Sequence, residues 1–165
     1  MLSAYKPTGM NQDLKRIRAI ADYQFGFGVG DALFPKDASF ERSRRTGKIR
    51  FIWIGETLLA ALRPTNGFLT FTIAGAERLV SSVNSLGCTV AIQDDVAEVI
   101  VQGRNVMARH VVEAGGGIRP GDEVIVLDSK KEVQAVGRAL LTGEEMLAFR
   151  TGVAVRTRRG RDRDR

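Results

Sequence analysis

Short apolar runs separated by glycine turns fill the second half of the chain and limit the folds open to it. EVIVLD (123–128) is almost continuously apolar, VQAVGRALL (133–141) follows a polar turn, and GVAVRTR (152–158) alternates apolar and basic residues. Runs of this length between turn residues are typical of strands in a barrel or sandwich. The capping-box pattern that starts at Thr142 predicts one helix over 143–150. We therefore expect a barrel-like second half.

The first half has a mixed helix and strand pattern. Residues 14–25 and 76–86 place apolar side chains at helical spacing. Residues 49–53 alternate in character, which predicts a strand whose odd-numbered side chains, Ile49, Phe51 and Trp53, face the core. Asn-Gly at 66–67, between two apolar runs, predicts a β-hairpin. These elements indicate an α+β domain.

The pattern changes at Asp94-Asp95, which we interpret as the domain boundary. Beyond it, 96–101 predicts a strand and 105–110 a helical turn. At 165 residues the chain can form one ordinary domain or two small ones. We predict an α+β fold with a small N-terminal domain (1–94), a second domain (95–158) and a basic tail without fixed structure (159–165).

The charge is positive and uneven. The net charge is +6 with a pI near 10; residues 1–94 carry +4, residues 95–155 carry −2, and residues 156–165 carry +4. This balance favours polyanionic partners such as nucleic acid. No run approaches the ~20 apolar residues of a spanning helix, and the start lacks the pattern of a secretory signal. We expect a soluble, cytoplasmic protein without a membrane partner.

The strongest local charge lies in FERSRRTGKIRFIW (40–53). Five cations occur there with no acid among them: Arg42, Arg44, Arg45, Lys48 and Arg50. We interpret this segment as a track for nucleic-acid phosphates, which would give a salt-sensitive affinity that does not read sequence. The alternative is a solvated, flexible loop.

Residues for catalysis or metal binding are scarce. Cys88 is the single cysteine and His110 the single histidine, so neither a disulfide nor a thiolate metal cluster is expected. The glycines at 26, 28 and 30 follow a helical pattern and lack the third glycine of the dinucleotide fingerprint, so we interpret them as a structural bend. No nucleophile–base pair is evident. We expect no enzyme activity, cofactor or metal.

Residues 103–160 resemble a PUA domain. The similarity rests on the order and spacing of five pieces: Gly103-Arg-Asn-Val, Ile118-Arg-Pro-Gly-Asp122, Ala135-Val-Gly-Arg-Ala139, Glu144-Glu-Met146 and Gly152-Val-Ala-Val155. The stretches ADYQFGFGVGDALF, ERSRRTGKIR, LLAALRPTNGFLTF and AGAERL resemble the small domain that precedes PUA in archaeal archaeosine tRNA-guanine transglycosylases. The resemblance covers nearly the whole chain.

This resemblance implies a compact α+β domain followed by a PUA pseudo-β-barrel, with tRNA as ligand and an archaeal source. The transglycosylase's catalytic barrel and zinc site have no counterpart here, so only the accessory, RNA-holding portion is matched. The PUA resemblance places RNA at Gly103, Arg104, Asn105, Arg109, Gly152, Arg156 and Arg158. Asn105 and Arg109 are four residues apart and are expected to share a helical face.

We therefore predict a non-catalytic RNA-binding protein that acts in RNA modification. It would hold the acceptor-end region of tRNA, or another structured RNA, through arginine–phosphate contacts. Two alternatives remain open: an RNA-binding subunit of a separate tRNA-modifying enzyme, and a protein–protein adaptor in ribosome assembly.

Overall fold

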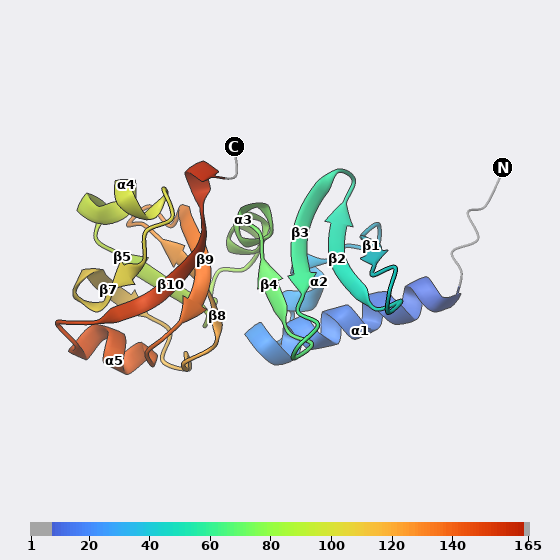
Figure 1. The fold of residues 1–165 in the computed structure, drawn as a ribbon, viewed down its shortest axis with the longest axis horizontal. Coiled ribbons are helices and arrows are strands. Elements are labelled where there is room, and N and C mark those ends of the chain that lie inside the picture. Colours follow the sequence, from blue (N-terminus) through green and yellow to red (C-terminus); the bar gives the residue numbers. More distant parts are fainter. Residues whose placement is uncertain (1–7, 164–165) are drawn as a thin grey trace.

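The computed structural model describes residues 8–163; the predicted tail therefore ends outside the described residues, at 164–165. Figure 1 shows two β-sheet units side by side, with α3 between them. In the first unit, helices lie against a four-stranded antiparallel sheet of order β1-β2-β3-β4. Its elements are α1 (Thr8–Phe25), α2 (Val29–Leu33), β1 (Ser39–Arg42), β2 (Ile49–Ile54), β3 (Thr57–Leu62), β4 (Leu69–Phe71) and α3 (Ile73–Ser82).

The second unit is a six-stranded, nearly closed barrel-like sheet of order β6-β10-β9-β8-β5-β7. Its strands are antiparallel except for the parallel pair β5–β8. The elements are β5 (Thr89–Ile92), η1 (Asp94–Val96), α4 (Ala97–Ile100), β6 (Val106–Met107), η2 (Ala108–His110), β7 (Val111–Ala114), β8 (Glu123–Leu127), β9 (Val133–Ala139), α5 (Gly143–Ala148), β10 (Val153–Gly160) and η3 (Arg161–Arg163). The predicted α+β class with a barrel-like second half is confirmed.

Several elements follow directly from local sequence signals. The apolar stripe of α1 buries Ile17 and Ala21 completely. Strands β3 and β4 form the predicted hairpin, and Gly67 adopts φ 72° in the turn between them. Thr142 accepts the Glu145 backbone N–H while the Glu145 side chain accepts the Thr142 N–H, so the predicted capping box starts α5.

One continuous apolar core joins the two units. The buried cluster of α1 and the first sheet also contains Ile125 and Leu127 of β8, Val136 of β9, and Cys88, which precedes β5. The opposite faces of the same barrel strands form a second cluster inside the barrel. Strand β8, buried on both sides, is therefore shared by both cores, which explains its almost continuously apolar sequence.

The boundaries of the second unit differ from the predicted ones. Thr89–Ile92 pairs with β7 and β8, so the barrel sheet begins before residue 94. At the other end, Arg159 and Gly160 continue β10 against β9, and Arg161–Arg163 form a helical turn. The expectation of a tail without fixed structure is therefore wrong for 159–163.

Two local predictions in the barrel are also wrong. Residues 96–101 form the end of η1 and helix α4 instead of a strand, and this turn buries Ile100 and Val101 while the Val101 carbonyl accepts the Asp162 N–H. Covering the barrel end outweighs the strand propensity of the valines.

Within 105–110, Val106 pairs with Val155 as part of β6, which separates Asn105 from Arg109. They do not share a helical turn.

A β-bulge alters the faces of β2. Arg42 of β1 pairs with Ile49 whereas Glu41 pairs with Phe51, so two β2 residues oppose one β1 residue. Ile49 is buried, but beyond the bulge Ile52 is the fully buried side chain and Phe51 is only partly buried. The predicted inward orientation of every odd-numbered side chain is wrong beyond the bulge.

No described helix combines the length and apolar character that crossing a membrane requires.

Gly75 provides a test of the packing between α3 and β3. A Cβ atom added there would lie 2.0 Å from the Leu59 carbonyl oxygen, which is fixed in the sheet. We expect Gly75→Ala to lower the free energy of unfolding by about 2 kcal/mol, because the helix must move away from the strand. Gly116→Ala, where a Cβ meets nothing within 4 Å, is the control and should change it little. Equal unfolding midpoints in urea would contradict this close approach.

Candidate nucleic-acid interface

The β1–β2 hairpin carries the basic segment predicted to face phosphates. Its turn is closed by hydrogen bonds from the Ser43 N–H to the Lys48 carbonyl and from the Gly47 N–H to the Ser43 carbonyl, both 2.8 Å. The side chains of Arg44, Arg45 and Lys48 are exposed. Within the described part of the chain they have no ion-pair partner. The turn thus presents three available cations to solvent.

The other two cations of this segment have intramolecular contacts. Arg42 forms an ion pair with Asp13 of α1 and donates to the Gly47 carbonyl at 2.9 Å, which ties the hairpin to the helix. The Arg50 guanidinium carbon lies 5.3 Å from the centroid of the Phe51 ring, within cation–π range. The Arg42 guanidinium therefore holds the hairpin against α1. The Arg50 side chain is exposed on the same hairpin as the three cations of the turn.

The loop between α4 and β6 holds the first predicted PUA positions. Gly103 adopts φ 96°, a conformation that favours glycine. Arg104 is exposed. The Asn105 Oδ1 accepts the backbone N–H of Thr157 at 3.1 Å and so fixes the loop against β10. Asn105 thus positions the loop on which Arg104 is presented.

The remaining loop positions lie where η2 meets the start of β10. The Ala108 N–H donates to the Gly152 carbonyl at 3.0 Å. Arg109 is exposed and its Nε lies 3.2 Å from Nε2 of His110, whose Nδ1 is 3.2 Å from Gln93 Oε1. Contacts with β10 and the turn before it therefore bring the predicted PUA positions together at one part of the barrel.

The arginines of β10 have different roles. Arg156 is exposed and pairs in register with Arg138 of β9, which places two cations on neighbouring strands. Arg158 lies at a β-bulge, and its guanidinium binds the carboxylate of Glu123. Three of its hydrogen bonds are made within the chain, so Arg158 has a structural role, and its contact with phosphate stays a prediction.

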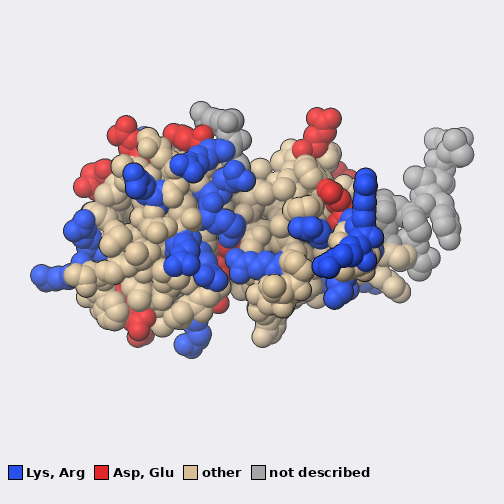
Figure 2. Space-filling model, in the orientation of Figure 1, with Lys and Arg blue, Asp and Glu red and all other residues tan. Residues whose placement is uncertain are grey.

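Basic side chains of both units lie on the face that Figure 2 shows. Figure 2 shows Lys and Arg gathered over the barrel, at the junction of the units and around the β1–β2 hairpin, with few acidic side chains between them. A surface of this kind attracts a polyanion over its whole length, because each cation adds to the same local potential.

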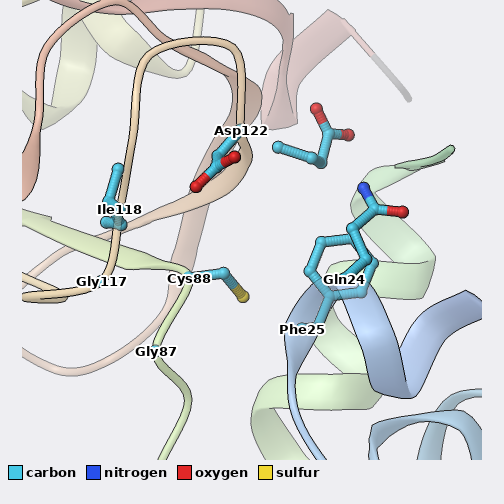
Figure 3. A pocket seen from close by; sticks show the side chains of 8 residues that line it. Gln24, Phe25, Gly87, Cys88, Gly117, Ile118 and Asp122 are labelled. Carbon is cyan, nitrogen blue, oxygen red and sulfur yellow. The ribbon is translucent and has the colours of Figure 1, made fainter. Parts of the chain in front are cut away.

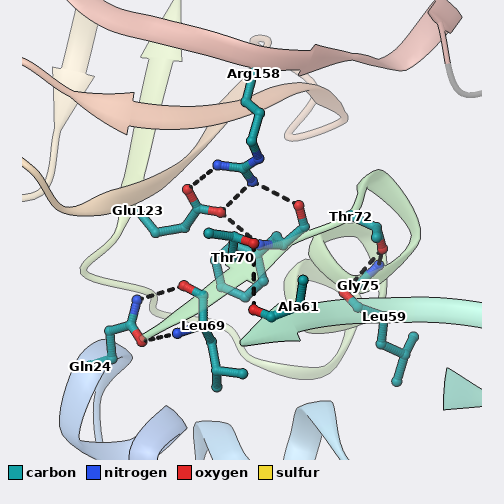
Figure 4. A network of polar contacts seen from close by, with 10 residues as sticks. Gln24, Leu59, Ala61, Leu69, Thr70, Thr72, Gly75, Glu123 and Arg158 are labelled. Carbon is teal, nitrogen blue, oxygen red and sulfur yellow. Dashed lines mark hydrogen bonds and ion pairs between the residues drawn. The ribbon is translucent and has the colours of Figure 1, made fainter. Parts of the chain in front are cut away.

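A polar network that the sequence analysis did not find joins the two units (Figure 4). Arg158 donates to both carboxylate oxygens of Glu123, with N–O distances of 2.6 and 2.5 Å, and to the Phe71 carbonyl at 2.8 Å. The Glu123 Oε2 also accepts the Phe71 N–H at 2.6 Å. The Glu123 side chain is only 2% exposed, and this burial raises its pKa against the lowering effect of Arg158.

The same network completes the outer edge of β4. The side chain of Gln24 accepts the Leu69 N–H at 2.9 Å and donates to the Leu69 carbonyl at 2.8 Å (Figure 4). Two residues along, Glu123 and Arg158 bind the N–H and carbonyl of Phe71. Side chains therefore replace the missing neighbouring strand. Residues this far apart in the chain give no local sequence signal of the contact.

The pocket between the units does not offer evident catalytic chemistry. It has a volume of about 170 Å³ and contains the Cys88 thiol near Gln24, Phe25 and Asp122 (Figure 3). Burial raises the pKa of Cys88 to about 12, so the thiol stays protonated and is a poor nucleophile at neutral pH. Among the described residues there is no cluster of His, Cys, Asp and Glu suited to a metal ion.

Comparison with protein families identifies both units. Residues 89–161 match the PUA domain, so the chain is a PUA-domain protein. Its first unit, residues 15–85, matches the patch-forming domain C2 of tRNA-guanine transglycosylase. The chain therefore belongs to the proteins that combine this C2 domain with a PUA domain, as the sequence resemblance predicts.

Longer proteins contain the same pair of domains. The chain is 40% identical over 148 residues to the tRNA-guanine(15) transglycosylase of Methanothermobacter thermautotrophicus, covering 90% of this chain and 23% of that protein. It is 42% identical over 146 residues to that of Thermococcus kodakarensis, covering 88% and 25%. The chain thus spans about a quarter of the length of these relatives.

Solved structures share the whole arrangement. A hypothetical protein from the hyperthermophilic archaeon Pyrococcus horikoshii OT3 superposes with a TM-score of 0.74 at 22% identity, covering 90% of each chain. A conserved PUA domain protein from Thermoplasma acidophilum gives 0.65 at 22% identity, covering 90% of this chain and 89% of that chain. Because both structures are only 22% identical to this chain, the similarity shows that the fold is shared and carries no statement about function.

The ion pair between the units provides a second prediction. Arg158→Met leaves the buried Glu123 carboxylate without its counter-charge, and we expect a loss of about 3 kcal/mol in the free energy of unfolding. Adding Glu123→Gln should restore part of this stability, because the unpaired charge is removed while an acceptor for Phe71 remains. Arg156→Met, at an exposed position of the same strand, is the control and should have little effect. Equal losses in urea unfolding for Arg158→Met and Arg156→Met would contradict the structural role.

Proposed function

We propose that this chain is a non-catalytic RNA-binding protein that acts in tRNA modification. The observation that carries the proposal is the basic face shared by the C2 and PUA units (Figure 2). The relatives that contain both domains are named tRNA-guanine(15) transglycosylases, which favours tRNA as the ligand. Residues 95–155 of the barrel carry a net charge of −2, so the positive charge of this unit comes from the basic end of β10 and the turn after it.

The binding surface that we propose has two parts, one on each of two units that share an apolar core. The hairpin part contains Arg44, Arg45, Lys48 and Arg50; the PUA part contains Gly103, Arg104, Arg109, Gly152 and Arg156. Exposed guanidinium groups can donate two hydrogen bonds to one phosphate, and glycines allow the backbone to approach RNA closely. Arg42, Asn105 and Arg158 support this surface through their intramolecular contacts.

A second candidate keeps the same surface but changes its context. The C2–PUA pair accounts for about a quarter of the length of the matched transglycosylases. The chain would then serve as an RNA-holding part that acts with a separate tRNA-modifying enzyme. Copurification with such an enzyme would favour this candidate.

A protein adaptor in ribosome assembly would instead bind RNA weakly near physiological salt. A cytoplasmic location stays a prediction under each of these functions.

The hairpin cations can be tested through the salt dependence of binding. We expect the triple variant Arg44→Ala, Arg45→Ala, Lys48→Ala to bind unmodified tRNA more weakly and to reduce the slope of log K against log salt by up to about one for each lost phosphate contact. A control with the same change in charge replaces exposed cations on other elements: Lys15, Arg16 and Lys130. An equal loss in this control would show that overall charge, not the hairpin, determines affinity.

The PUA part leads to a prediction about the acceptor end. We expect removal of the 3′ CCA from unmodified tRNA to weaken binding at two salt concentrations by a similar factor, because contacts to unpaired nucleotides are lost. The double variant Arg104→Ala, Arg156→Ala should reduce the difference between intact and trimmed tRNA. Equal binding of both tRNAs by the unchanged protein would instead indicate a general phosphate clamp.

A further inference from the structure

A cleft of about 580 Å³ opens at the junction of the two units. One wall comes from the end of α1 and the β3–β4 turn, with Tyr23, Arg63 and Phe68. The other comes from the loop ahead of β8, with Arg119 and Asp122. The predicted phosphate-binding segments contribute none of these residues, so the cleft is a separate feature of the surface.

The aromatic side chains of the cleft are unusually accessible. Tyr23 is 82% exposed and Phe68 is 40% exposed. Their rings are nearly parallel, with an interplanar angle of 14° and centroids 6.4 Å apart. The two rings therefore leave apolar area in contact with water, and their planes are already close to parallel. A flat, apolar ligand can cover them without much side-chain reorganisation.

Hydrogen bonds fix the backbone that carries these two rings. The Asn66 Oδ1 accepts the Phe68 N–H at 3.0 Å, and the Arg63 N–H donates to the Phe68 carbonyl at 2.8 Å. Next to Tyr23 in the chain, Gln24 is fixed by its two hydrogen bonds to Leu69. The rings thus stand on backbone segments that belong to the junction between the units.

The charge of the cleft suits an anion that is attached to an aromatic group. Within the described residues, the guanidinium groups of Arg63 and Arg119 have no hydrogen-bond or ion-pair partner. Of the two nearby carboxylates, Glu123 is paired with Arg158 and also feels the charge of Arg63, and Asp122 accepts the backbone N–H of Arg119 at 2.8 Å. Two available cations therefore accompany one exposed carboxylate.

We propose that this cleft binds an unpaired nucleotide of single-stranded RNA, with the base stacked on Tyr23 and Phe68 and its phosphate near Arg63 and Arg119. Base stacking on exposed aromatic side chains is a general means of binding single strands, and it tolerates any base. The inference rests on the proposed RNA-binding function. It adds a site for base stacking to a surface whose other proposed contacts are made by arginine, lysine and glycine residues.

Strand pairing in the barrel connects the cleft to the proposed basic face. Arg138 of β9 pairs in register with Glu123 at the cleft on one side and with Arg156 on the other. An RNA whose duplex part lies on the basic face could therefore extend a single strand into the cleft. A partner protein covering the rings is the competing occupant.

The test compares two RNAs, a blunt hairpin and the same hairpin with a six-nucleotide single-stranded 3′ extension. We expect Tyr23→Ala with Phe68→Ala to weaken binding of the extended hairpin about tenfold or more and to leave the blunt hairpin unchanged. Phe27→Ala is the matched control, because Phe27 is fully exposed in the turn after α1 but does not line the cleft. Equal loss for both RNAs, or no loss for the extended one, would overturn the proposal, and the second result would favour a protein occupant.

A second measurement separates this inference from the proposed function. Adenosine monophosphate is titrated into the unchanged chain while the NMR signals of the Tyr23 and Phe68 rings are followed. Shifts of the Phe68 ring that are absent in Tyr23→Ala support the cleft even if neither hairpin binds, in which case the proposed RNA-binding function alone fails. Hairpin binding without any ring shift or any effect of the double variant overturns the cleft alone.

Discussion

The open edge of β4 is the structural problem on which the arrangement of this chain depends. Backbone N–H and carbonyl groups at a sheet edge must find partners once they are buried. Here Gln24 binds both groups of Leu69, while Glu123 and Arg158 bind those of Phe71. Because Glu123 and Arg158 come from two barrel strands, the C2 unit completes its sheet only when the PUA barrel is docked. The shared apolar core around Ile125 and Leu127 reinforces the same orientation.

This fixed orientation matters for a ligand longer than either unit. A flexible link would let the hairpin cations and the PUA cations bind independently, and ordering them would cost entropy at each encounter. Because the units share an apolar core, basic side chains of both already lie on one face (Figure 2). The geometry then selects polyanions that can reach both segments at once. Arg158 contributes by holding the units together. The PUA resemblance, in contrast, predicts that this residue contacts RNA directly.

The elements predicted correctly are those with local causes: the apolar stripe of α1, the Asn-Gly turn before β4 and the capping box of α5. The errors have non-local causes. Helix α4 forms because the barrel end must be covered, and its valines alone indicate a strand. The bulge in β2 depends on pairing with β1. The Glu123–Arg158 pair joins residues 35 positions apart, and Gln24 contacts Leu69 across 45. For the candidate site, sequence locates basic positions but cannot tell an available guanidinium from one already paired.

The distinction between available and paired cations also separates two kinds of contact with RNA. Arg44, Arg45 and Lys48 stand on a turn with no internal partner, so they can follow a phosphate backbone without reading it. Tyr23 and Phe68 are instead held beside the network that joins the two units, with their rings aligned in advance. A duplex offers phosphates but keeps its bases stacked, whereas a single strand offers both. A chain that combines these features should therefore favour RNA at a point where duplex changes to single strand, and the rigid junction sets the distance from that point to the hairpin.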